Sequence, residues 1–138
     1  MLKICSCGER MDLSLRTVIF AKKVNITNVP VYSCATCGRN DVFHGVKEDV
    51  GRLISRLDAG FGADKLDIPF DQVHEWAGVL SGMRAQKRTL EPSDIARATE
   101  ERTNQLLDLL NLATALGDET WKQELRSRLA QLSAQYIS

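Results

Sequence analysis

The amino-acid sequence predicts an α+β fold, with a β-rich N-terminal part and an α-helical C-terminal part. Three observations lead to this prediction. Residues 13–32 are rich in β-branched and aromatic side chains, which favour strands. From Val46 onward, apolar residues recur at the spacing of an amphipathic helix. Near the C-terminus, Gly117 and Asp118 separate two long helical patterns, which predicts an antiparallel helix hairpin.

Three strand-like segments make up the β-rich part. The first covers residues 13–21, and the second covers residues 24–27, where apolar and polar residues alternate as in a half-buried strand. The third covers residues 29–32 and contains Pro30. Because proline lacks a backbone N–H, this segment is expected at an edge of the sheet or with an irregular entry.

A change of pattern after the strands divides the chain into three parts. Residues 1–58 are predicted to form a β/α head that ends in a helix starting at Val46. Residues 59–69 contain two glycines and a proline and are expected to be a linker. Residues 70–138 are predicted to form an α-helical domain.

Capping residues place the helices of that domain. Asp71 is expected to N-cap a short helix that carries Trp76. Pro92 marks the start of a long helix, because proline is favoured at the first helical position. Gly117 suits the position just beyond the end of this helix, and Asp118 suits the N-cap of the last one.

The four cysteines occur as two short pairs, Cys-Ser-Cys-Gly from Cys5 and Cys-Ala-Thr-Cys-Gly from Cys34. Zinc takes four ligands at the corners of a tetrahedron, about 2.3 Å from each sulfur. Two pairs on tight turns supply that geometry, and cysteines in a reducing compartment are more often metal ligands than disulfides. The sequence therefore predicts a zinc-ribbon-like head around one structural Zn²⁺, held by Cys5, Cys7, Cys34 and Cys37.

The first pair is one residue shorter than the second, which leaves its coordination open. Cys5 is expected to bind the ion despite the tighter turn. The alternative is that Cys7 binds alone and that another residue completes the site. His44, seven residues after Cys37, is the substitute ligand that the sequence offers, although the preferred interpretation is an ordinary surface or partly packed histidine.

A thiol redox centre is a further alternative for these cysteines. A redox Cys-x-x-Cys is expected near a βαβ pattern, and two pairs together favour metal instead. The sequence also contains no Gly-rich phosphate loop, no His-Glu-x-x-His motif and no other evident catalytic set. The chain is therefore predicted not to be an enzyme.

The second cysteine pair ends a distinctive stretch, Val-Pro-Val-Tyr-Ser-Cys-Ala-Thr-Cys-Gly, which starts at Val29. Together with the first pair, the β-rich stretch and the following helix, it makes residues 1–58 resemble the YgiT-type zinc-finger family. Members of that family carry Cys-x-x-Cys in the first pair, from which Cys5 departs by one residue. The resemblance implies a small zinc-stabilised β/α unit that often binds protein, as it does in antitoxins.

Antitoxins of this family carry a separate helix-turn-helix domain that binds DNA. The predicted hairpin of this chain has charged residues of mixed sign, whereas a recognition helix is expected to be basic or rich in amides. Overall, residues 1–58 have a net charge of +3 and residues 59–138 of −3, so no broad basic surface is expected. Nucleic acid is thus only an alternative partner, through a local basic patch. Its residues are Arg16, Lys22, Lys23 and Arg39.

Apolar and aromatic side chains on the predicted helices exceed what one partner helix needs. Trp76, Leu109, Trp121 and Tyr136 are candidate protein-binding residues, because tryptophan and tyrosine are favoured anchors at interfaces. Packing in the core is the ordinary alternative for such residues. The excess of leucines predicts docking of another protein or homo-oligomerisation.

These features predict a non-enzymatic, zinc-stabilised regulatory or adaptor protein that acts by binding another protein. A DNA-binding transcription regulator of the antitoxin type is the alternative, and a thiol redox enzyme is the third candidate. The chain carries no apolar run of membrane-spanning length and no secretory signal, which predicts a cytoplasmic protein without membrane contact.

Overall fold

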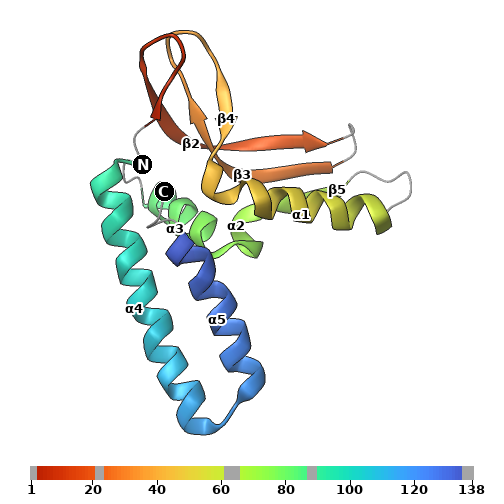
Figure 1. Ribbon diagram of the computed structural model, residues 1–138, viewed down its shortest axis with the longest axis vertical. Coiled ribbons are helices and arrows are strands. Elements are labelled where there is room, and N and C mark those ends of the chain that lie inside the picture. The colour runs from red at the N-terminus through yellow and green to blue at the C-terminus, as the bar shows by residue number, and fades with distance from the viewer. Residues whose placement is uncertain (1–2, 21–23, 61–65, 87–89, 135–138) are drawn as a thin grey trace. The chain divides into compact units, whose positions relative to one another are not determined.

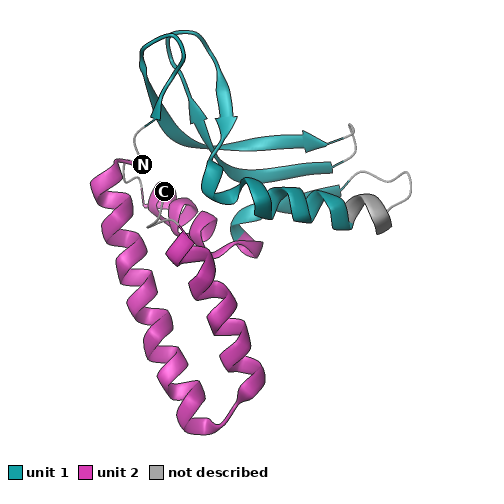
Figure 2. Ribbon diagram, in the orientation of Figure 1, with its two compact units in different colours: residues 1–71 teal, residues 72–138 magenta. Residues whose placement is uncertain are grey.

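The computed structural model describes residues 3–20, 24–60, 66–86 and 90–134, and it has the predicted α+β fold (Figure 1). The chain divides into two compact units, residues 1–71 and residues 72–138 (Figure 2). The first unit contains the sheet and one long helix, and the second is helical.

A five-stranded sheet forms most of the first unit. Four strands pair antiparallel in chain order: β1 (Lys3–Ile4), β2 (Arg10–Phe20), β3 (Val24–Ser33) and β4 (Asn40–Val42). β5 (Leu66–Pro69) pairs in parallel with the first part of β3. β3 is therefore the central strand, with β2 along one edge and both β5 and β4 along the other.

A β-bulge at Asn28 keeps one face of β3 buried along its whole length. The register with β2 shifts between Arg16 and Val18, and Asn28 has a φ of 59°. Asparagine tolerates this left-handed conformation better than most residues. Because the extra residue reverses the alternation, Val24 and Ile26 share one buried face with Val29 and Val31. After the bulge, Pro30 and Tyr32 on the opposite face are buried as well.

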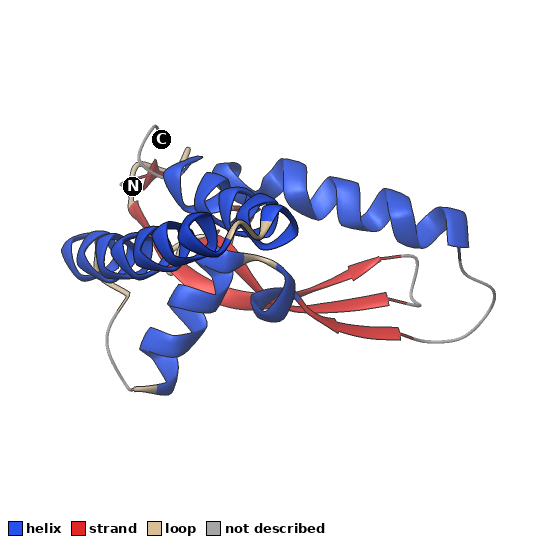
Figure 3. Cartoon of the chain, turned by 90° about the horizontal axis from the view of Figure 1, so that it is seen from below, coloured by secondary structure: helices blue, strands red, loops and turns tan. Residues whose placement is uncertain are grey.

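α1 (His44–Gly60) lies along the sheet (Figure 3). Val46, Val50 and Leu53 are buried, and their spacing of four and three residues places them on one face of the helix. The apolar periodicity of the sequence predicted this face. Together with the buried face of β3, these side chains form the core of the first unit.

The structure differs from the three-part division into residues 1–58, 59–69 and 70–138. α1 continues to Gly60, and the second half of the expected linker forms β5, so the first unit extends to Asp71. Leu66 and Ile68 alternate with polar neighbours, which is a strand signal that the nearby glycines obscured. Because its partner β3 lies far earlier in the chain, no local pattern identified this strand.

Pro30 lies in the central strand and not at an edge, and the bulge at Asn28 just before it is the irregular entry that was the alternative expectation. It stands opposite Leu15 of β2, at the point where the other edge of β3 changes its partner from β5 to β4. Neither of these strands is in register with Pro30, so the missing N–H interrupts no ladder there. Its carbonyl accepts a hydrogen bond from the N–H of Phe43 at 2.9 Å.

Three long helices form the core of the second unit: α3 (Glu75–Ala85), α4 (Pro92–Leu116) and α5 (Glu119–Ser133). A single helical turn, α2 (Phe70–Val73), spans the boundary between the units. α4 and α5 form the predicted antiparallel hairpin, and α3 packs against both of them (Figure 1). No helix in the described part of the chain combines the length and the apolar character that a membrane span requires.

The turn between α4 and α5 has the predicted caps. Gly117 adopts a φ of 67° just beyond α4, a conformation that glycine tolerates. Asp118 N-caps α5, and its Oδ1 accepts a hydrogen bond from the N–H of Trp121 at 3.0 Å. Pro92 lies at the start of α4, as its sequence context predicted.

The helix expected to begin at Asp71 is split at His74 into α2 and α3. His74 is the N-cap of α3, and its Nδ1 accepts a hydrogen bond from the N–H of Ala77 at 3.4 Å. Asp71 lies one turn earlier, in α2. Since a neutral imidazole nitrogen accepts a hydrogen bond much as a carboxylate does, the buried histidine takes the capping role.

Candidate metal centre

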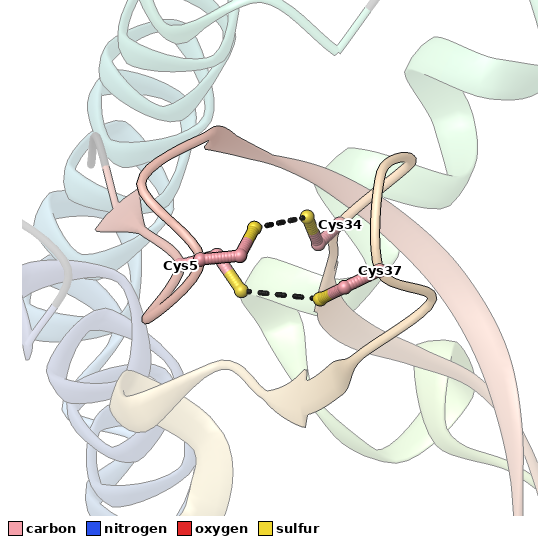
Figure 4. A group of neighbouring side chains, drawn as sticks. Cys5, Cys34 and Cys37 are labelled. Atoms are coloured by element: carbon pink, nitrogen blue, oxygen red, sulfur yellow. Dashed lines mark hydrogen bonds between the residues drawn. The ribbon is translucent and has the colours of Figure 1, made fainter.

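The four cysteines converge at one end of the sheet. Cys5 and Cys7 lie in the turn between β1 and β2, and Cys34 and Cys37 lie in the turn between β3 and β4. All four Sγ atoms are within 4.8 Å of one another. The Sγ atoms of Cys5 and Cys37 are 3.4 Å apart, and those of Cys7 and Cys34 are 3.6 Å apart (Figure 4).

These distances fit a tetrahedral metal site. A metal–sulfur distance of about 2.3 Å at tetrahedral corners separates neighbouring sulfur atoms by about 3.8 Å. The observed separations are far longer than a disulfide bond of about 2.05 Å, and all four cysteines are free thiols. The cluster can therefore hold a single metal ion that prefers sulfur ligands.

The turn of the second pair closes with two backbone hydrogen bonds. The N–H of Gly38 donates to the carbonyl of Cys34, and the N–H of Cys34 donates to the carbonyl of Arg39, both at 2.9 Å. Gly38 has a φ of 76°, as expected for a glycine that follows the second cysteine of a metal-binding turn.

The turn of the first pair closes in the same way with one residue fewer. The N–H of Gly8 donates to the carbonyl of Cys5 at 2.9 Å, and the N–H of Cys5 donates to the carbonyl of Glu9 at 2.8 Å. Gly8 also has a positive φ, of 95°. The shorter Cys-x-Cys spacing therefore tightens the turn but keeps both closing bonds, and Cys5 reaches the cluster.

Backbone N–H groups point at the sulfur atoms of the leading cysteines. The N–H of Cys7 donates to Cys5, and with the neighbouring thiol of Cys37 it lowers the pKa of Cys5 to about 6. The N–H of Cys37 donates to Cys34 and lowers the pKa of that thiol below its ordinary value of 9.0. These donors favour the thiolate, which is the form that binds metal.

The two trailing cysteines hold their protons more tightly. The N–H of Glu9 lowers the pKa of Cys7, but hydrogen bonds to the neighbouring thiols outweigh it and raise that pKa to about 12. At Cys37 the N–H of Arg39 acts in the same direction and is likewise outweighed, so its pKa is raised. Metal binding would release these protons, since all four ligands must be thiolates.

His44 does not belong to the cluster. It is exposed at the first turn of α1, where its ring stacks on Phe43 with the ring centroids 4.7 Å apart. Among the described residues, the group able to hold a metal consists of the four cysteines. This arrangement agrees with the interpretation of His44 as a surface residue.

Two polar contacts that were not predicted from the sequence join the segments around the cluster. Arg39 Nη1 donates to Ser6 Oγ at 2.6 Å and so links the two cysteine turns. Lys3 Nζ lies 3.3 Å from Asp41 Oδ2 and links β1 to β4. The partners are more than thirty residues apart in the chain, so no spacing pattern could have indicated them.

The candidate protein-binding residues differ in how far they are exposed. Trp76 is completely buried, and its Nε1 donates to Thr99 Oγ1 at 3.2 Å, so it packs in the core of the second unit and is not a surface anchor. Leu109 and Trp121 are partly exposed. Tyr136 lies outside the described residues, as do Lys22 and Lys23 of the expected basic patch.

Comparisons with known proteins found no similar protein. No protein-family model, curated protein or solved structure matches the chain. Fold and site together define an α+β protein of two units with a four-cysteine cluster suited to a metal ion. The resemblance of residues 1–58 to YgiT-type zinc fingers stays a prediction from its sequence motifs.

Proposed function

We propose that this chain is a non-enzymatic regulatory or adaptor protein, stabilised by zinc, that acts by binding another protein. The closed set of four cysteine sulfurs carries this proposal. Four thiolate ligands fill a tetrahedral ion and leave no position for water or substrate. An ion held in this way stabilises the fold and does not react.

Zinc is the metal that suits this site best. All four donors are sulfur, and the sulfur atoms lie close enough together to surround a single ion. Cys5, Cys7, Cys34 and Cys37 would hold it, and the ion would join the β1–β2 turn to the β3–β4 turn. The first unit is small, so a bound ion adds substantially to the stability of its limited core.

A protein partner is favoured by the surface of the second unit. Leu112 and Leu116 on α4 are both exposed by more than 40%. Large exposed apolar side chains on a helical surface favour contact with protein. The balanced charge of the chain gives no comparable support for nucleic acid.

Two measurements on the full-length protein test the proposal. Metal analysis is expected to find about one zinc ion per chain. Co-purification from the native cells, followed by reconstitution from purified components, is expected to yield a stoichiometric complex with a protein. A folded, metal-free chain would contradict the zinc assignment. Salt-sensitive binding to duplex DNA without any protein partner would instead support the transcription regulator.

A further inference from the structure

One flank of α4 carries leucines that neither α3 nor α5 covers. Gln105, Leu109, Leu112 and Leu116 follow one another at intervals of four, three and four residues, so they lie along one flank. Arg102 extends this flank, because its Nη1 donates to Gln105 Oε1 at 3.0 Å. Leu112 is 48% exposed and Leu116 is 66% exposed.

A matching flank runs along α5. Trp121, Glu124 and Arg128 follow one another at intervals of three and four residues. Arg128 Nη1 lies 4.0 Å from Glu124 Oε1, which confirms that these two side chains share a flank. The side chain of Trp121 is partly exposed, one turn closer to the hairpin turn than Glu124.

Both flanks border the same side of the hairpin. Glu75 of α3 accepts hydrogen bonds from Arg102 Nε of α4 and, at 2.9 Å, from Arg128 Nε of α5. α3 therefore covers this side near the two arginines. Closer to Gly117, the exposed leucines mark the part that α3 leaves uncovered. We call it the Leu/Trp surface, formed by Leu109, Leu112, Leu116 and Trp121.

Carboxylates border the Leu/Trp surface. Glu101 and Asp108 are exposed on α4, and Asp108 lies one turn before Leu112. On α5, the side chain of Glu124 is 64% exposed. With Glu75, the carboxylates on these flanks number four against the two guanidinium groups of Arg102 and Arg128, so the rim of the surface has a net charge of −2 (2 − 4).

This charge decides between two occupants. A second copy of the chain in a symmetric dimer would bring the same rim against itself, and like charges would repel. A helix with an apolar stripe between lysine or arginine residues would cover the leucines and at the same time pair its positive charges with the carboxylates of the rim. Such a helix presents its anchors at intervals of three and four residues, which matches the spacing on α4.

We propose that the Leu/Trp surface is the docking site for an amphipathic helix of a partner protein, with a leucine-rich stripe and basic flanks. The inference rests on the proposed adaptor function and names the surface that serves it. It also names the chemistry of the partner, which is cationic and helical.

Binding of a synthetic helical peptide tests this proposal on the full-length protein. The probe has about 18 residues, with leucines at intervals of three and four residues and lysines beside them. In the control peptide, glutamates replace the lysines. We expect the lysine peptide to bind at least tenfold more tightly, because only its charge complements the rim.

The two tryptophans provide an internal control for the place of binding. In heteronuclear NMR spectra, the lysine peptide is expected to shift the indole N–H signal of Trp121. The signal of Trp76 should stay in place, because that indole is buried against Thr99 in the core. A shift of Trp76 alone, or of neither signal, would contradict the proposal.

Matched variants locate the contact. Leu112→Gln and Leu116→Gln are expected to weaken peptide binding at least tenfold, and Asp108→Lys should reduce the preference for the lysine peptide. Leu107→Gln and Glu100→Lys are the controls, because both residues are exposed on the opposite flank of α4 and should change binding less than twofold. Thermal unfolding verifies that each variant folds.

Three results would overturn the proposal: no saturable binding of either peptide, equal binding of both, or equal loss in Leu107→Gln and Leu112→Gln. A wild-type dimer that Leu112→Gln dissociates would also overturn it and would make the surface a self-association site. None of these results bears on zinc content or on a reconstituted complex with the native partner. Failure of the docking surface is thus distinguishable from failure of the proposed function.

Discussion

At the scale of single residues, Glu75 joins the three long helices of the second unit. Its carboxylate accepts hydrogen bonds from Arg102 and Arg128, and its backbone N–H donates to Gln131 Oε1 at 2.8 Å. Burial raises the pKa of this carboxyl group, but the hydrogen bonds from the two guanidinium groups outweigh it and hold the pKa below its ordinary value of 4.5. Glu75 is therefore a charged, paired group at the meeting point of α3, α4 and α5.

Replacement of this carboxylate should destabilise the second unit. We expect Glu75→Gln to lower the free energy of unfolding by about 2 kcal/mol, because two partly buried guanidinium groups lose a charged acceptor. Urea unfolding, followed by tryptophan fluorescence, measures this change. Glu124→Gln is the control and should change stability by less than about 0.5 kcal/mol, because its side chain is mostly exposed.

The contribution of Glu75 should also depend on pH. Its pKa is lower in the folded protein than in the unfolded chain, so its stabilising effect is fully present above pH 4.5 and is lost as the pH falls through the folded value. The stability difference between wild type and Glu75→Gln should therefore shrink below pH 4.5. A difference that grows on acidification would refute this explanation of the pairing.

The choice of ligands is a second question at the residue scale. We expect Cys5→Ser to lose most of its bound zinc, because the Sγ of Cys5 lies 3.4 Å from that of Cys37 within the cluster. His44→Ala should keep the full complement of zinc, since its ring stacks on Phe43 away from the cysteines. Metal analysis of the purified variants measures both, and the reverse result would show that His44 is the fourth ligand.

At the scale of elements, two glycines in helical context have opposite roles. Gly117 has a positive φ just beyond α4, whereas Gly82 lies inside α3 with open space around its Cα. We expect Gly117→Ala to destabilise the protein by about 1 kcal/mol, because alanine disfavours the left-handed conformation. Gly82→Ala should stabilise it by about 0.5 kcal/mol, through better helix propensity. Thermal unfolding of the two variants checks this contrast.

Elements with a strong local signal could be predicted from the sequence. The caps at Gly117 and Asp118 and the apolar face of α1 depend on residues a few positions apart, so spacing alone indicates them. Each cysteine pair is also a local motif, because its residues lie within a few positions of one another and are followed by a glycine with positive φ. That the two pairs would meet was inferred from the ligand chemistry of zinc. In the structure, the strands of the sheet place the two cysteine turns next to each other.

Elements that depend on distant partners escaped prediction. β5 is a short strand whose pairing with β3 depends on residues far apart in the chain. Trp76 was a candidate anchor, but its burial depends on α4, which supplies Thr99 as a hydrogen-bond acceptor. The Arg39–Ser6 contact arises only once the two cysteine turns are adjacent. In each case the deciding partner comes from another element.

At the scale of the whole molecule, the chain divides into two compact units, and the cysteine cluster lies in the first. Removal of zinc with a strong chelator is therefore expected to unfold the first unit and to leave the second folded. Both tryptophans belong to the second unit, so their fluorescence should change little. Limited proteolysis should then cleave within residues 1–71. Equal protection of that region with and without zinc would contradict a structural ion.

The bulge at Asn28 ties the length of β3 to the metal site. It reverses the alternation of the strand five residues before the chain leaves β3 and enters the turn with Cys34. A deletion of one residue there would restore plain alternation, and the thiol of Cys34 would emerge on the wrong side of the sheet. Homologues should therefore conserve the number of residues between Ile26 and Cys34 as strictly as the cysteines themselves, even where the identities of those residues vary.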